Sequence, residues 1–466
     1  MTTARNRLVA VGLLIGVLAV SACGSKYDLE EVLASENQGR SAITEHAGAV
    51  SSGGEVGSGQ PDLTGTTVAP GGDAPSGATT SPGAGPSGTP ASGGDAPAAA
   101  GCTSQGAPVV IGQVGGFSGL VGSAVNGTTQ GLAVWARDVN ARGGLACHPV
   151  QVISRDDGSD PAKSQAAVND LVSKNAIALV SAQHPVNVAG YRAAVEAKQI
   201  AAIGGDQVQD VWEQSAFFFP VGSTNDGLFA GAVSAAVDAG FDKVATLYCV
   251  ESTACSALNR VVQEQQGAIG YTSVYSATVS LTQTDFTAAC QNAKNAGATA
   301  IAFGADAAAL QRLARNCETL GGYKPAFIIT GLQAGFDKAD PLLRRNGVFA
   351  SSPVAPASSD AQAGFRKAVQ TYAPSSPSNT ASAHAYTSGL MLEAAVNRLG
   401  DSARGSLTRE MVLQALRTVS DEDLGGLIPK VTYRNGPQPE NKCFYPLAFG
   451  ASGEITAPRG NQAVCL

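Results

Sequence analysis

The sequence predicts an α/β fold in which two parallel sheets, each covered by helices, form two lobes. Short β-branched runs alternate with amphipathic stretches from residue 108 onward, which is typical of a parallel sheet with helices on both faces. The strand-and-helix units fall into two clusters, at about 108–225 and 240–350, separated at 220–226. The chain has 466 residues, 44% of them hydrophobic, and is therefore long enough for one large two-lobed domain.

Seven apolar runs are expected to be strands: 109–111, 150–153, 177–180, 201–203, 244–247, 300–303 and 327–329. Between the first two runs, Leu132, Trp135 and Val139 recur at helical spacing, so Trp135 is expected in the core. Gly143 and Gly144 are expected to end that helix.

The next helix has a clear start signal. Asp160 precedes Pro161, which predicts a carboxylate N-cap followed by proline in the first helical turn. Two later helices are expected around 383–399 and 407–417. The first two predicted strands are thus each followed by a helical segment, as a parallel sheet requires.

The N-terminus is expected to be an export signal. Arg5 and Arg7 precede an apolar run at 8–20, which is shorter than the roughly 20 residues that span a bilayer, so residues 1–22 are interpreted as a signal peptide. The following Ser-Ala-Cys-Gly resembles the lipobox of bacterial lipoproteins, which implies that Cys23 carries lipid. The alternative is an ordinary secreted chain with a chance cysteine at this position.

Residues 23–106 are expected to hold the lipid anchor and a disordered tether. The stretch 51–101 consists mostly of Gly, Ser, Pro, Ala and Thr, with no aromatic residue, Lys or Arg. Such a segment cannot bury enough apolar surface to offset the entropy of ordering. The globular head is therefore predicted at 107–466.

The cysteines fit an oxidising compartment. Of the 9 cysteines, Cys23 is assigned to lipid, and the remaining eight form an even set in an exported chain. We expect four disulfides between sequence neighbours: Cys102–Cys147, Cys249–Cys255, Cys290–Cys317 and Cys443–Cys465. Metal ligation is the alternative, but no CxxC or Cys/His spacing supports it.

Charge and motifs argue against two classes of function. The net charge is −7 and the basic residues form no run, so nucleic acid is not an expected partner. The sequence contains no GxSxG, HExxH, SxxK or Walker motif and only 4 histidines, so we expect no enzyme and no cofactor.

Four ordered fragments resemble the periplasmic binding proteins of the Leu/Ile/Val-binding family: IGQVGGFSG at 111–119, GLA at 131–133, DVNARGGL at 138–145 and RDDGSDP at 155–161. The resemblance implies a two-lobed type I periplasmic-binding-protein fold, each lobe a doubly wound, mainly parallel sheet. It also implies three interlobe crossings, expected near 220–226, 351–356 and 425–433. Lobe 1 would comprise about 107–222 and 355–426, and lobe 2 about 226–352 and 432–466.

The family binds its ligand with loops that follow the strands. This implies fourteen ligand-binding positions: Phe117, Ser118, Gln183, His184, Asn187, Gly205, Asp206, Gln207, Glu251, Ser252, Thr253, Asp306, Gln333 and Phe336. The amino-acid binders usually carry a Ser-rich stretch where this chain has 183–187, and small residues where it has Asp206. These departures put an α-amino acid ligand in doubt without excluding it.

Each candidate also has a structural interpretation. His184 precedes Pro185 and fits a turn as well as a binding site, while Phe117 fits either a stacking wall or loop packing. Asp206 and Asp306 could neutralise an ammonium group or cap a helix. The acid pair Asp156 and Asp157 lies between a strand and a turn, which favours a structural role.

The resemblance implies an extracytoplasmic solute-binding lipoprotein of an ABC importer. It would capture a small polar solute, an amino acid or related amide or organic acid, by hinge closure. The expected partners are that solute, the ABC permease subunits and, through Cys23, the outer face of the cell membrane; the protein is expected to be a monomer. The alternative is a ligand-binding sensor or protein-interaction module at the cell surface.

Overall fold

The computed structural model describes residues 102, 105–119, 122, 125, 127–304, 307–329 and 340–466. Several predictions lie outside these residues: the signal peptide at 1–22, the lipid site Cys23, the tether up to residue 101, and the candidates Asp306, Gln333 and Phe336. In the described part of the chain, no helix combines the length and the apolar character needed to cross a membrane.

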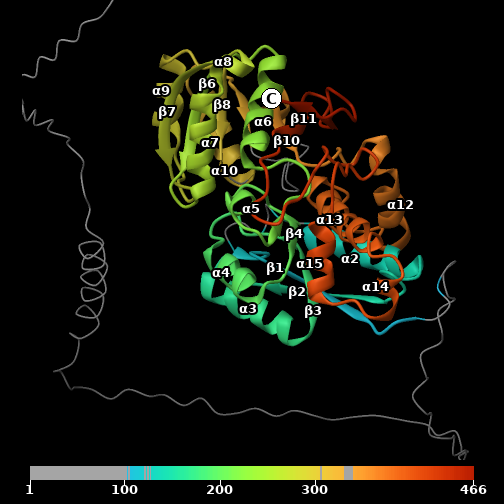
Figure 1. Cartoon of the computed structure of the whole chain (residues 1–466). Coiled ribbons are helices and arrows are strands. Elements are labelled where there is room, and N and C mark those ends of the chain that lie inside the picture. The colour runs from blue at the N-terminus through green and yellow to red at the C-terminus, as the bar shows by residue number, and fades with distance from the viewer. Residues whose placement is uncertain are drawn as a thin grey trace, which may run out of the picture. The chain divides into compact units, whose positions relative to one another are not determined.

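The first sheet is parallel throughout, with the order β2-β1-β3-β4-β5. Figure 1 labels β1, β2, β3 and β4 of this sheet. Its strands are β1 (Val109–Gly115), β2 (Val150–Asp156), β3 (Ala176–Ala182), β4 (Ala202–Gly205) and β5 (Phe218–Phe219). Every residue of β3 is buried, as expected of a strand covered on both faces. Four of the seven predicted strands are confirmed here.

Helices cover both faces of this sheet, and together they form lobe 1. One face packs against α3 (Pro161–Ser173), α4 (Ala189–Lys198) and α5 (Val211–Gln214). The other packs against α2 (Thr128–Ala141) and against later elements, α12 (Ala363–Tyr372), α13 (Thr380–Asn397), α14 (Ser402–Gly405) and α15 (Arg409–Leu416), while η2 (Asp360–Gln362) adjoins α12. The sheet is therefore doubly wound, as predicted.

The local signals for two of these helices are confirmed. Helix α2 ends at Ala141, and Gly143 and Gly144 follow with φ of 108° and 88°. At α3, the Asp160 carboxylate accepts hydrogen bonds from the N–H groups of Ala162 and Lys163, 2.8 and 3.0 Å away. Trp135 is fully buried, as expected.

The second sheet is mixed and, with its helices, forms lobe 2. Its order is β12-β11-β10-β9-β8-β6-β7, and β13 pairs with β11. The strands are β6 (Lys243–Cys249), β7 (Thr272–Val279), β8 (Ala300–Phe303), β9 (Ala326–Ile328), β10 (Val348–Ser352), β11 (Cys443–Phe449), β12 (Ile455–Thr456) and β13 (Val464–Cys465). Strands β6 to β10 pair in parallel, whereas β11 runs antiparallel to β10.

Helices also cover both faces of the second sheet. One core contains α6 (Asn225–Asp238) and α7 (Thr253–Glu264), and α8 (Gln266–Ile269) adjoins them. The opposite core contains α9 (Thr287–Asn295), α10 (Ala307–Glu318) and α11 (Pro341–Asn346). Strands β6, β8 and β9 and the two layers of helices agree with the predicted second lobe.

The chain passes between the two sheets three times, as the family resemblance implied. The first passage connects β5 to α6 and the second connects β10 to η2, both close to their predicted positions. The third lies later than the predicted 425–433, because Ile428, Val431 and Tyr433 still belong to the core of the first sheet. It therefore runs from Tyr433 to Cys443, and lobe 1 extends beyond the expected limit at 426.

The four expected disulfides are present with the expected partners: Cys102–Cys147, Cys249–Cys255, Cys290–Cys317 and Cys443–Cys465. Cys290–Cys317 joins α9 to α10, and Cys443–Cys465 pairs the start of β11 with β13. Among the described residues, no cluster of three or more His, Cys, Asp or Glu is arranged to hold a metal ion.

Candidate functional site

The candidate site lies where strands of both sheets end. In open parallel sheets, ligands bind beyond the carboxyl ends of the strands, because the loops to the following helices converge there. In the described residues, four such loops carry predicted site residues: those after β1, β3 and β4 in the first sheet and the loop after β6 in the second.

The loop after β1 is organised by Asp156. One carboxylate oxygen accepts hydrogen bonds from the N–H groups of Phe117, Ser118 and Gly158, at 3.0, 3.3 and 3.0 Å. Burial raises the pKa of Asp156, but the hydrogen bonds from Ser118, Gly158 and Phe117 outweigh it and hold the pKa below its ordinary value. Asp156 is thus ionised and structural, while Ser118 stays exposed at the loop surface.

The loop after β3 points its histidine inward. The ring of His184 stacks on Tyr191 with centroids 4.2 Å apart, and its Nε2 lies 2.9 Å from Oδ2 of Asp157. The same carboxylate accepts a hydrogen bond from the Ser164 hydroxyl. Because His184 is 2% exposed and its ring is engaged inside lobe 1, the geometry favours the structural interpretation of this residue.

Hydrogen bonds keep Asp157 ionised in this interior position. Burial raises its pKa, but the hydrogen bond and charge of His184, with the bonds from Ser164 and the Ser159 N–H, lower it below the ordinary value. Asp157 follows β2 and His184 follows β3, so the pair connects two strands that flank β1.

The loop after β4 is tied to the loop after β3. Oδ2 of Asp206 accepts a 2.7 Å hydrogen bond from the His184 N–H, and burial raises the pKa of Asp206 to about 6. Helix α5 begins at Val211, so Asp206 does not cap it. Gly205 has φ of 156°, and a side chain there would meet the carbonyl oxygen of Ala182.

Three further candidates have structural partners. Gln207 is fully buried and bonds through its side chain to Ser223 and to the Val221 N–H, which fixes the start of the first passage. Gln183 is buried, and its backbone continues the pairing of β3 with β1. Asn187 is exposed, and its amide oxygen accepts from the N–H of Ala189 at the start of α4.

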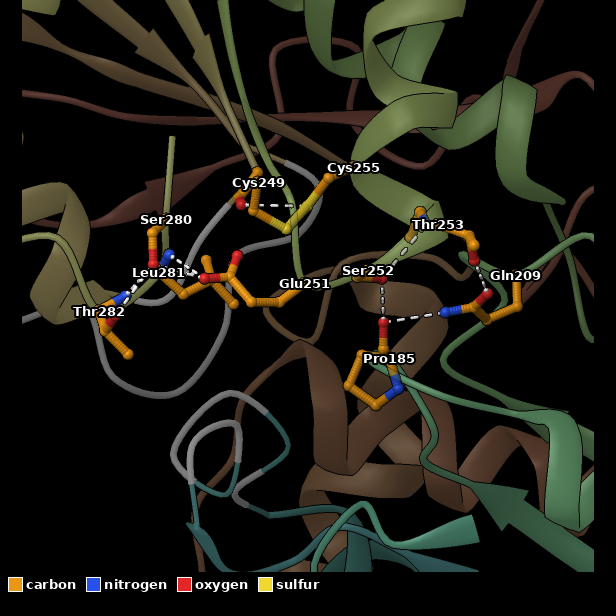
Figure 2. The surroundings of a disulfide bond; sticks show 12 residues. Pro185, Gln209, Cys249, Glu251, Ser252, Thr253, Cys255, Ser280, Leu281 and Thr282 are labelled. Atoms are coloured by element: carbon orange, nitrogen blue, oxygen red, sulfur yellow. Dashed lines mark hydrogen bonds between the residues drawn. A yellow bond between two sulfur atoms is a disulfide. The ribbon is translucent and has the colours of Figure 1, made fainter. Parts of the chain in front are cut away.

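The loop after β6 reaches lobe 1 (Figure 2). The Ser252 hydroxyl donates to the carbonyl oxygen of Pro185 at 2.7 Å, and the Thr253 hydroxyl donates to the amide oxygen of Gln209 at 2.9 Å. On the other side of the loop, Glu251 accepts from the Ser280 hydroxyl and the Leu281 N–H. Ser252 and Thr253 are therefore brought against the first sheet's loops, and Glu251 is turned away from them.

Gln209 was not among the sequence candidates. It is buried, and its Nε2 donates to the carbonyl oxygens of Pro185 at 2.9 Å and His184 at 3.4 Å. The side-chain amide of Gln209 therefore accepts the hydrogen bond from Thr253 and also holds the loop after β3. The available signal was its position, three residues beyond Asp206 in a loop that follows a strand.

A cavity of about 470 Å³ adjoins this contact. Residues of both lobes line it, including Asn187, Arg192 and Gln209 from lobe 1 and Glu251 and Thr253 from lobe 2. Its volume falls in the range of about 300–1,000 Å³ that small-molecule sites occupy.

The profile of the family described as periplasmic binding protein matches residues 108–447, which is most of the chain. The chain belongs to the periplasmic binding protein family. The family resemblance and the α/β fold predicted from sequence are thereby confirmed, and the family consists of binding proteins rather than enzymes.

Solved structures agree on the fold of this periplasmic binding protein. A fatty acid ABC transporter substrate-binding protein from Thermomonospora curvata is 18% identical, with a TM-score of 0.64 over 79% of this chain and 95% of its own. A branched-chain amino acid ABC transporter protein from Thermus thermophilus, with bound valine, is 13% identical, with a TM-score of 0.64 over 78% and 97%.

A third solved structure, an R. palustris solute-binding protein in complex with benzoate, is 16% identical, with a TM-score of 0.60 over 77% of this chain and 98% of its own. A sequence search of curated proteins gives no match. The named ligands of the three structures differ in chemistry, so the shared fold does not by itself indicate a solute.

Proposed function

We propose that this chain is the extracytoplasmic, lipid-anchored solute receptor of an ABC importer. In this proposal its two lobes close over a small polar solute and present it to the permease. The observation that carries the proposal is the pair of hydrogen bonds, Ser252 to Pro185 and Thr253 to Gln209, that join loops at the strand ends of both sheets.

The three passages between the sheets would serve as the hinge for closure. Two of them lie against each other, because a side chain at Gly222 in the first would meet the carbonyl oxygen of Pro353 in the second. A few residues at such passages can absorb the backbone rotation of a hinge while each sheet moves as a unit. Solute contacts made from both lobes would then favour the closed arrangement.

The cavity lining carries both charges, with Arg192 from lobe 1 and Glu251 from lobe 2. A lining of mixed charge suits a zwitterion such as an amino acid better than a solute of a single charge. Among the expected solutes, amino acids are therefore preferred to organic acids.

The N-terminal features complete the proposal. Cleavage after residue 22 and lipid on Cys23 would hold the protein at the outer face of the membrane, with 23–106 as a tether for a monomeric head. Disulfides in the head suit an oxidising exterior, which supports this location.

A thermal-shift screen tests the proposal. The mature chain carrying Cys23→Ser, which receives no lipid, would be melted with amino acids, short amides, organic acids, polyamines and sugars. A ligand at about 100 times its Kd stabilises the protein by about 2.7 kcal/mol. Stabilisation by an amino acid or amide is expected; silence across the panel with a cooperative melt would favour a sensor or protein-interaction role instead.

A further inference from the structure

We propose that the Cys249–Cys255 disulfide fixes residues 250–254, here called the latch loop, in the conformation that joins the two lobes, and so controls how tightly they close. This inference rests on the proposed function and adds to it a covalent device that tunes closure. The latch loop carries both Ser252 and Thr253, the residues that reach Pro185 and Gln209 (Figure 2).

The position of the disulfide confines the loop at both ends. Cys249 is the last residue of β6 and Cys255 lies in the first turn of α7. The disulfide therefore encloses only the five residues of the latch loop. Both cysteines are buried and pack with Leu281 in a small apolar cluster. The crosslink therefore acts on the loop directly.

Glu251 supplies a third point of attachment. Its carboxylate accepts hydrogen bonds from the Ser280 hydroxyl at 2.5 Å and the Leu281 N–H at 3.0 Å. Burial raises the pKa of Glu251, but these bonds and its own backbone hold the pKa below the ordinary value, so the carboxylate is ionised and the attachment persists at neutral pH.

The donor direction of Ser252 depends on this loop conformation. Its hydroxyl oxygen accepts a hydrogen bond from the Ala254 N–H at 3.2 Å, as the N-cap of α7, and its proton is then directed to Pro185. A loop that left the N-cap geometry would lose the contact with lobe 1 as well. The hydroxyl thus couples the local structure of lobe 2 to the junction.

A crosslinked loop is already ordered before the lobes meet. Without the crosslink, closure would have to restrict five residues, and that entropy would oppose closure. The contacts across the junction are neutral hydrogen bonds, so the expected change on loosening the loop is moderate, about 2- to 10-fold in the equilibrium between closed and open forms.

Hydrogen exchange measured by mass spectrometry tests the proposal on the mature chain with Cys23→Ser. The variant is Cys249→Ala with Cys255→Ala. Its matched control is Cys290→Ala with Cys317→Ala, which removes a buried disulfide from the same lobe but not from the latch loop. Exchange is followed in residues 183–188 of lobe 1, with and without a mixture of the protein amino acids and their amides.

In the wild type, the mixture is expected to protect 183–188. The Cys249/Cys255 variant should lose about 2- to 10-fold of that protection, whereas the control keeps it. Equal protection in the variant and the control overturns the latch. If the variant gives no cooperative melt, the folded wild type treated with a phosphine reductant replaces it, with mass analysis identifying the reduced pair.

Failure of the proposed function gives a different result. In that case the mixture changes neither the melting temperature nor the exchange of the wild type. The comparison without solute then tests the role of the disulfide. Faster exchange of 183–188 in the Cys249/Cys255 variant than in the control supports that role, and equal exchange in both contradicts it.

Discussion

Nε2 of His184 lies 2.9 Å from Oδ2 of Asp157, and the two side chains connect the ends of β3 and β2 across the intervening β1. Both are almost fully buried. Because the pair lies inside lobe 1, its loss is expected to lower the stability of the fold more than it weakens solute binding.

Asp157→Asn is expected to destabilise the protein. The amide cannot accept all the hydrogen bonds that Ser164, His184 and the Ser159 N–H now donate, and a buried group left without its partner costs about 1–3 kcal/mol. Urea unfolding measures the loss. The control is Asp160→Asn, where asparagine caps α3 about as well as aspartate; equal unfolding midpoints for the two variants would contradict the account.

Asp206→Asn is expected to change how stability depends on pH. Burial raises the pKa of Asp206 from 3.8 to about 6 in the folded protein, so the folded state holds this proton more tightly and the contribution of Asp206 to stability falls as pH rises from about 4 to about 6. The asparagine variant, which still accepts from the His184 N–H, should be more stable than wild type by about 1–3 kcal/mol at pH 7.

Thermal melts at several pH values check this prediction. The advantage of Asp206→Asn should shrink toward zero near pH 4, because the wild-type carboxyl is protonated there. A stability advantage that does not change with pH, or a variant that is less stable than wild type at pH 7, would show that folding does not raise the pKa of Asp206.

Gly222→Ala is expected to disturb the hinge. Gly222 has φ of 94°, and a methyl group there would meet the carbonyl oxygen of Pro353. Gly240→Ala is the matched control, because Gly240 has φ of 93° with open space around it. Both variants carry the backbone strain of about 1–2 kcal/mol, so a melting temperature lower in Gly222→Ala than in Gly240→Ala isolates the contact between the two passages.

Gln209→Leu is expected to weaken solute binding by about 10-fold, because it removes the partner of Thr253 and the amide that orients Pro185. Titration with a solute found in the thermal-shift screen measures the change. Gln165→Leu, at an exposed position on α3, is the control and should leave affinity unchanged. Unaltered affinity in Gln209→Leu would remove this residue from the closing contact.

The sequence predicted the elements whose signals are local. Asp160 before Pro161 marks the start of α3 because a cap and a proline act within one turn. Strand β7 was missed although it is rich in Thr, Ser and Val; it lies at the edge of the sheet and buries few of its side chains. Strand β11 contains Pro446, which argues against a strand, and pairs with β10 almost a hundred residues away.

The sequence predicted which loops form the candidate site, but not which side chains in those loops bond to one another. The position of Ser252 and Thr253 directly after β6 predicts a role in the site, and both residues lie at the junction. That His184 would turn inward to Asp157, and that Gln209 would receive Thr253, depends on how separate loops pack, which no local pattern records.

Small-angle scattering of the mature Cys23→Ser chain tests the central claim, which is that a solute closes the two lobes. The radius of gyration is measured without solute and at saturation with the strongest stabiliser from the screen. A smaller radius of gyration at saturation is the predicted result. An unchanged radius, with binding demonstrated by titration on the same sample, would contradict hinge closure as the mechanism.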